Sequence, residues 1–200
     1  WAGWGWVWAM KILHTCHGDL ALPAFLPDAT RAVVKTLDAS DLTDCGVKGL
    51  VVNTLHLSSH PGASLISNLG GIHRFMGWNG PVISDSGGFQ VFSLIAESPK
   101  AGGISSRGFT YRLDRGQKKI LTPEKCIQKQ FQIGADVMFC LDHCTHPEDG
   151  KDVQQESVNH TIEWARRCKE EFQRRLEQGL PGGPRPLLFA VIQGGVDQAL

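Results

Sequence analysis

The sequence lacks a long apolar stretch, an excess of charge of either sign and a CxxC pair, and each absence narrows the function. No apolar run approaches the roughly 18 residues that a membrane-spanning helix needs. Lys and Arg number 20, as do Asp and Glu, so bulk electrostatics give no reason to expect nucleic acid or an anionic membrane. The chain is 42% hydrophobic and needs no disulfides to build a core. We therefore expect its six cysteines to be thiols of a cytoplasmic protein.

Short apolar runs and helical patterns alternate along the chain. Runs without polar alternation are typical of strands buried on both faces of a parallel sheet. Four such runs end in a polar residue beside a turn, at 49–53, 81–85, 135–142 and 186–193. Helices are predicted from Thr122-Pro123 onward and over about 152–178, where apolar residues recur every three or four positions.

This alternation predicts an α/β fold, either a barrel or a doubly wound sheet. Residues 98–119 are predicted to form an inserted hairpin or loop, and residues 12–30 a short β segment. Eight strand–helix units of a barrel take about 250 residues, and only four are evident here. We therefore expect residues 12–200 to be the first half or so of a barrel. Residues 1–11 form a Trp-rich leader to which we assign no function.

One polar segment directly follows the second apolar run: Asp85-Ser86-Gly87-Gly88-Phe89-Gln90. A carboxylate at the carboxyl end of a barrel strand lies at the barrel mouth, where barrel enzymes keep their active sites. The paired glycines would let backbone N–H groups approach a ligand, the aromatic ring could stack, and the amide is a further candidate contact. The alternative is a turn in which the carboxylate caps the next helix.

A second polar cluster, Asp142-His-Cys-Thr-His146, ends the third run. Its His and Cys residues could bind a metal, but adjacent residues at a strand end point in different directions. A single functional carboxylate, Asp142, with Cys144 packing beside it or lining the site, is favoured over a metal and over a solvated turn.

The last run ends in Gln193-Gly194-Gly195. A primary amide donates and accepts hydrogen bonds at once, which matches the edge of a purine, although a plain turn is the default for such a tripeptide. Parallel strands bring their carboxyl ends to one side of the sheet. Two acids, an amide and an aromatic ring at that side can recognise a flat heterocycle.

Basic residues gather in the expected insert, where Lys118-Lys119 follow Arg112 and Arg115. This stretch is the better candidate for contacting an anion such as phosphate. The alternative is ordinary solvated surface charge, which is the favoured explanation of the Arg-rich, Glu-rich helix at about 152–178.

Together the segments resemble the tRNA-guanine transglycosylases, also called queuine tRNA-ribosyltransferases. The resemblance runs from His14 to the end of the chain. It rests on the order and spacing of eight blocks: His14–Asp19, Asn53–Leu57, Gly70–Trp78, Ser84–Leu94, Leu121–Glu124, Gly134–Asp136, Asp142–Thr145 and Gln193–Gly195.

The resemblance implies an irregular (β/α)8 TIM-like barrel and a pentosyltransferase of queuosine biosynthesis. Such an enzyme replaces guanine in the tRNA anticodon loop by a 7-deazaguanine, queuine or its precursor, through a covalent glycosyl-enzyme. By the resemblance, Asp85 is the proton acceptor and donor, Asp142 accepts from the base, and Gln193 donates to its O6. The other implied substrate-binding residues are Ser86, Gly87, Gly88, Phe89 and Gly194, with Gln90 and Cys144 as further candidates.

Three departures from the family pattern qualify these implications. No residue here matches the motif of the nucleophilic Asp, so we expect this chain alone to be inactive. The family's zinc cluster, CxC-x2-C with a distant His, has no counterpart, so we assign no metal or cofactor to this chain. Leu55 stands where an aromatic residue is usual, and His143 where Glu is usual.

The expected partners are a tRNA anticodon loop, the 7-deazaguanine base and a homo- or heterodimeric second subunit, with no membrane. Two alternatives remain open: a non-catalytic partner subunit of such an enzyme, and a relative that modifies DNA. The presence of both Asp85 and Asp142 argues against the first.

Overall fold

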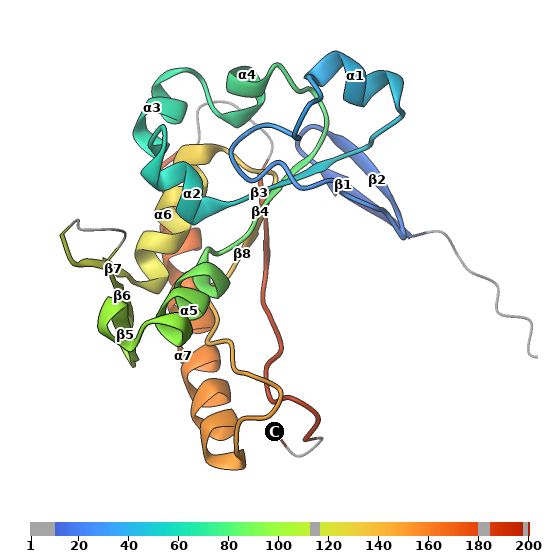
Figure 1. Cartoon of the computed structure of the whole chain (residues 1–200). Coiled ribbons are helices and arrows are strands. Elements are labelled where there is room, and N and C mark those ends of the chain that lie inside the picture. The colour runs from blue at the N-terminus through green and yellow to red at the C-terminus, as the bar shows by residue number, and fades with distance from the viewer. Residues whose placement is uncertain (1–10, 113–116, 180–184, 198–199) are drawn as a thin grey trace, which may run out of the picture.

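The computed structural model describes residues 11–112, 117–179, 185–197 and 200. The Trp-rich leader lies outside the described residues except for Lys11. The chain is a mixed α/β structure built on one parallel sheet of four strands (Figure 1). In spatial order these are β3 (Leu50–Val52), β4 (Val82–Ser84), β8 (Val137–Phe139) and β9 (Leu187–Phe189).

The four apolar runs are confirmed as strands of a parallel sheet, although each strand is only three residues long. The order in the sheet follows the order in the chain, so each connection returns to the neighbouring strand. In the register of the sheet, Ile83 of β4 lies opposite Val51 on one side and Val137 on the other. Val82 and Val137 are fully buried, because helices cover the sheet.

Helices fill the connections between these strands. Both predicted helices are confirmed, as α6 (Pro123–Ile133) and α7 (Lys151–Glu177). Thr122 caps α6 by accepting from the Lys125 amide at 3.3 Å, and Gly134 ends it in a left-handed conformation. The remaining helices are α1 (Ala39–Asp44), α2 (Thr54–Ser59), α3 (Ala63–Asn68), α4 (Ile72–Met76), α5 (Gly88–Glu97) and the short 3-10 helix η1 (Pro99–Ala101).

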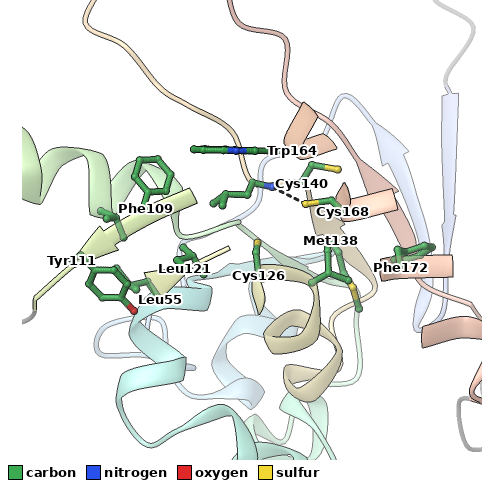
Figure 2. Packing of buried hydrophobic residues seen from close by; sticks show 13 residues of the cluster. Leu55, Phe109, Tyr111, Leu121, Cys126, Met138, Cys140, Trp164, Cys168 and Phe172 are labelled. Carbon is green, nitrogen blue, oxygen red and sulfur yellow. Dashed lines mark hydrogen bonds between the residues drawn. The ribbon is translucent and has the colours of Figure 1, made fainter. Parts of the chain in front are cut away.

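The main core packs β8, α6 and α7 together around Trp164 and three thiols (Figure 2). The cysteines at 126, 140 and 168 are buried and not in disulfides, which confirms the expected thiols at these positions. The dashed line in Figure 2 is the hydrogen bond from the Leu141 amide to the Cys168 sulfur, at 3.4 Å. Burial raises the pKa of the Cys126 thiol well above its ordinary value, so this sulfur stays neutral.

The predicted insert is confirmed and contains one more strand than a hairpin. Strands β5 (Gly102–Ser105), β6 (Gly108–Tyr111) and β7 (Lys119–Leu121) form an antiparallel sheet. The insert begins after α5 and leads directly into α6. The Trp164 indole N–H donates to the Ser106 carbonyl at 2.9 Å, which fastens the insert to α7.

The predicted β segment near the N-terminus is an antiparallel hairpin of β1 (Lys11–Thr15) and β2 (Gly18–Leu22). His17, in its turn, contacts a carboxylate at the start of β8: its Nδ1 lies 2.7 Å from Asp136 Oδ1. His73 Nε2 lies 3.0 Å from Asp136 Oδ2, and the Val82 amide donates to the same oxygen at 2.7 Å. Asp136 thereby joins three separate segments.

This carboxylate predicts a stability effect with a defined pH dependence. Burial alone would raise the pKa of Asp136, but the hydrogen bonds from His73, Val82 and His17 outweigh burial and hold the pKa below its ordinary value. The stabilisation is therefore complete above about pH 4, the pKa of an unfolded Asp, and is lost as the pH falls through the lower folded pKa. We expect Asp136→Asn to reduce the free energy of unfolding by about 2–4 kcal/mol at pH 7, measured by urea denaturation.

The matched control is Asp19→Asn, because Asp19 pairs with His14 at 2.9 Å with both side chains exposed. Its effect should stay within about 1 kcal/mol. Equal losses in the two variants would contradict a special role for the buried carboxylate.

Candidate active site

Polar side chains follow the carboxyl ends of the parallel strands, as expected from the sequence. Asn53 follows β3, Asp85 follows β4, and Asp142 lies three residues beyond β8. Gln193 lies four residues beyond β9, on a segment that runs beside the start of α7 (Figure 1). The structure brings these residues together as two hydrogen-bonded groups, one around Asp85 and one around Asp142.

Asp85 is surrounded by hydrogen-bond donors from the start of α2. Its Oδ2 accepts from the Asn53 side-chain amide at 2.7 Å, and its Oδ1 from the Thr54 backbone amide at 2.9 Å. The Gly87 amide donates to Oδ1 at 3.1 Å. Burial raises the pKa of Asp85 to about 6 although these donors lower it, and the charge of Asp28 adds to the increase. A carboxyl that titrates near pH 6 can both accept and donate a proton at neutral pH.

The two glycines after Ser86 were expected to let backbone N–H groups approach a ligand. The structure adds a second reason for them, because a side chain at either position would lie too close to its neighbours. Gly87 has φ +74°, and a Cβ there would lie 2.9 Å from the Cβ of Leu55. A Cβ on Gly88 would lie 3.1 Å from Leu141. The Gly88 amide donates to the Ser86 hydroxyl at 3.2 Å. In this structure the loop's amides bind its own side chains, so a ligand would meet the carboxylate first.

Phe89 and Gln90 lie in the first turn of α5. The Phe89 ring is 60% exposed, so it has a free face on which a flat ligand could stack. Gln90 places its side-chain oxygen Oε1 in a buried position without a hydrogen-bond partner among the described residues. This unsatisfied acceptor supports the choice of Gln90 as a candidate contact.

The second group is centred on Asp142, which is 6% exposed. Its Oδ2 accepts from the Gln193 side-chain amide at 2.7 Å and from the Cys144 thiol at 3.2 Å. Its Oδ1 accepts from the Ser86 hydroxyl at 3.3 Å. Four of the predicted site residues are therefore in direct contact, and Ser86 connects them to the Asp85 loop. Gly194 is buried, with φ +123°, and lets the chain turn directly after Gln193.

Cys144 supports the carboxylate rather than reacting. Burial, followed by the charge and hydrogen bonding of Asp142, raises the pKa of the Cys144 thiol to about 12. The thiolate is the nucleophilic form of cysteine, so at neutral pH Cys144 remains a neutral hydrogen-bond donor.

His143 and Leu55, the two unusual positions, both face the core. His143 is buried, stacks near Trp164, and has its Nδ1 3.1 Å from Nδ1 of His160. Leu55 belongs to the same apolar core as Trp164. Both therefore affect the site through packing.

Metal binding by the histidines of the 142–146 cluster has no support in the geometry. Among the described residues, one group of three metal-type ligands comes together: His17, His73 and Asp136. Its two imidazole rings are stacked, with centroids 3.5 Å apart and an interplanar angle of 17°. Nearly parallel rings do not converge on a tetrahedral ion, and both nitrogens already contact the carboxylate. The zinc cluster implied by the resemblance has no matching cysteine spacing, so these residues do not fit it.

Sequence reasoning missed Asn53, Thr54 and Asp28 as contributors to the site. Asn53 ends the first apolar run in the same way as Asp85 ends the second, and that parallel was the available signal. Asp28 forms an isolated parallel bridge with Val51, which places it beside β3. No periodic pattern marks such a single bridge, so Asp28 could not be predicted as a neighbour of the site.

Comparison with known proteins identifies the family of the chain. The family model for queuine tRNA-ribosyltransferase matches residues 10–200. The chain belongs to this family. It is 42% identical over 187 residues to the queuine tRNA-ribosyltransferase of Desulfosudis oleivorans, covering 92% of this chain and 46% of the relative. The enzyme of the same name from Staphylococcus aureus strain bovine RF122 is 38% identical over 192 residues, covering 96% and 48%. The chain thus spans about half the length of the family members it matches.

None of the helices in the described residues combines the length and apolarity needed to cross a membrane.

The raised pKa of Asp85 makes a testable prediction. The folded pKa of about 6 exceeds the unfolded value of about 3.9, so ionisation costs native-state stability. The stability contributed by protonated Asp85 is present below about pH 4 and is lost as the pH rises to about 6. Asp85→Asn cannot ionise at this position. We expect its free energy of unfolding, measured by urea denaturation, to rise relative to that of the wild type by about 2–3 kcal/mol as the pH increases from 4 to 6.5. For the control Asp152→Asn, at an exposed position, the free energy of unfolding should depend on pH as it does in the wild type. If Asp85→Asn shows the same pH dependence as the wild type, the raised pKa is contradicted.

Proposed function

We propose that this protein exchanges guanine in the tRNA anticodon loop for a 7-deazaguanine base, as a pentosyltransferase. The observation that carries the proposal is the hydrogen-bonded group of Asp142, Gln193 and Ser86 beside the Asp85 loop. Family membership supports the same activity. The non-catalytic subunit is not favoured, because both acids are present and held in place. The DNA-modifying relative is not favoured, because the matching family model and the relatives are named for ribosyl transfer to tRNA.

Guanine is recognised in this proposal by an exchange of partners. Without a ligand, the Gln193 amide satisfies Asp142 at 2.7 Å. A guanine edge offers two N–H donors, N1–H and the amino group, next to the acceptor O6. The donors would replace Gln193 on the carboxylate, and the released amide would donate to O6. The exposed ring of Phe89 would cover the heterocycle. The target nucleotide has to leave the loop stack to reach this position.

Asp85 supplies the proton transfer. Guanine is a better leaving group when it is protonated as the glycosidic bond breaks. The incoming base must lose a proton when the new bond forms. A carboxyl with a pKa of about 6 serves both directions because its two protonation states are close in free energy at pH 7. The covalent bond to C1′ is assigned by family resemblance to an Asp whose motif none of these 200 residues matches.

The proposal also covers the architecture and setting of the protein. The four parallel strands would be consecutive strands of an irregular (β/α)8 barrel, whose C-terminal edge holds the site. Buried thiols at 126, 140 and 168 suit the cytoplasm. A homo- or heterodimer rests on the family resemblance, and no metal is assigned to these residues.

Replacing Asp142 tests base recognition. Asp142→Asn leaves one acceptor oxygen for two guanine donors and adds an NH2 that opposes them. We expect the affinity for guanine to fall by about 5- to 150-fold, equivalent to about 1–3 kcal/mol, measured by calorimetry on the intact protein. Asp152→Asn on the exposed face of α7 is the control. Unchanged guanine affinity would remove Asp142 from the base site.

Replacing Asp85 tests proton transfer. In a full-length enzyme that also carries the nucleophilic Asp, Asp85→Asn should lower the rate of guanine exchange into tRNA by roughly 10²–10⁴, while a covalent protein–tRNA adduct still forms slowly and is detected on denaturing gels. If the variant binds tRNA but forms no adduct, Asp85 is the nucleophile and the assigned role is wrong.

A further inference from the structure

A cavity of about 540 Å³ lies between α2, β7 and the first turns of α6. Neither acid lines it, but Thr54 and Ser86, which donate to Asp85 and Asp142, do. Four lysines line it: Lys118, Lys119, Lys125 and Lys129. Among the residues that the structure describes, no acid lines it. In a chain of zero net charge, this is a marked local concentration of positive charge.

The lysines are not neutralised by the described residues around them. Lys118, Lys119 and Lys125 form no side-chain hydrogen bond or ion pair with any residue that the structure describes, and Lys129 donates only to the neutral Gln132, at 3.2 Å. The acid nearest in sequence, Glu124, is held by Arg167 at 2.7 Å, which also lowers its pKa to about 2. Four lysines therefore line one cavity without a counter-charge among the described residues.

Hydroxyl groups complete the lining. Ser58 and Ser59 of α2 lie in the wall, and the Ser58 oxygen is buried without a hydrogen-bond partner among the described residues. Ammonium groups and hydroxyls are donors that proteins use to hold phosphate.

We propose that this cavity binds backbone phosphates of the RNA substrate next to the nucleotide undergoing exchange. The inference rests on the proposed function and names a second contact surface for the same substrate. Ser86 lines the cavity and also donates to Asp142, so a strand whose base reaches the acids has its backbone close to the lysines. The lysines act as point charges, which suit a backbone read without regard to sequence.

The position of these lysines explains why the insert is basic. Lys118 and Lys119 stand at the start of β7, the strand that leads from the insert into α6. Arg112 does not line the cavity, and Arg115 lies outside the described residues. The anion contact expected from the sequence is thus assigned to the lysine pair rather than to Arg112.

The test compares two double variants of equal charge. Lys119→Gln/Lys125→Gln removes two cavity lysines, and Lys48→Gln/Lys169→Gln removes two exposed lysines elsewhere. Binding of the intact protein to unmodified tRNA with guanine in the anticodon loop is measured from 50 to 300 mM salt. Each lost phosphate contact should reduce the slope of log affinity against log salt by about 0.7, the value for single strands. We expect a reduction of about 1.4 for the cavity variant and none for the control.

Guanine binding and exchange kinetics separate this role from a structural one. The cavity variant should keep the wild-type affinity for guanine; in a full-length enzyme that also carries the nucleophilic Asp, it should keep the wild-type kcat while its KM for tRNA rises. Equal salt slopes for the cavity variant, the control and the wild type would overturn the proposal. So would a parallel loss of guanine affinity, because the lysines would then act through the fold of the base site.

Inorganic tripolyphosphate distinguishes RNA from a small phosphorylated ligand. If the wild type binds no tRNA, the proposed function itself fails. Should tripolyphosphate then raise the melting temperature of the wild type but not of the cavity variant, the cavity takes small polyphosphates and its assignment to RNA is wrong. If the wild type binds tRNA and the cavity variant loses both tRNA affinity and this tripolyphosphate shift, the assignment is supported.

Discussion

The site depends on a partly buried carboxylate that joins two strand–helix junctions. Asp85 ends β4, yet its oxygens are held by the side chain of Asn53 and the backbone amide of Thr54, which begin α2 after β3. The Thr54 hydroxyl donates back to the Asp85 carbonyl, so the two junctions are joined in both directions. Helix N-termini stabilise negative charge, whereas burial opposes it. The balance leaves the Asp85 pKa at about 6, and a change in either junction would shift it.

The hydrogen-bond donors around the two acids differ in what a ligand can displace. Two of the three donors to Asp85 are backbone amides, which cannot leave without unwinding a helix end. Asp142 is held by three side chains, those of Ser86, Cys144 and Gln193, and side chains can rotate away at small cost. Asp85 is therefore suited to proton transfer from a fixed position. Asp142 is suited to exchanging its partner for an incoming base.

The features of the fold that a local pattern encodes could be predicted from the sequence. The four apolar runs became strands and both periodic helices formed, because side-chain burial at fixed spacing determines each of them. The short helices at 54–59, 63–68 and 72–76 were missed, since five or six residues do not establish a period. The predicted runs were also longer than the strands: β8 ends at Phe139, while apolar sequence continues to Leu141 because Cys140 and Leu141 still face the core.

For the site, the sequence could predict which polar residues lie at the strand ends. It could not predict which of these residues contact one another. Ser86 was expected to be one member of a base-binding loop, and its neighbours in space lie far away in the sequence. Its hydroxyl donates to Asp142, its carbonyl lies 3.4 Å from the Cys126 sulfur of α6, and it lines the lysine cavity. Since α6 carries Lys125 and Lys129 on the cavity side, one short turn joins the base group to the basic wall. A substrate held at both places would be constrained on its base and on its backbone by a single loop, which fixes the glycosidic bond between them.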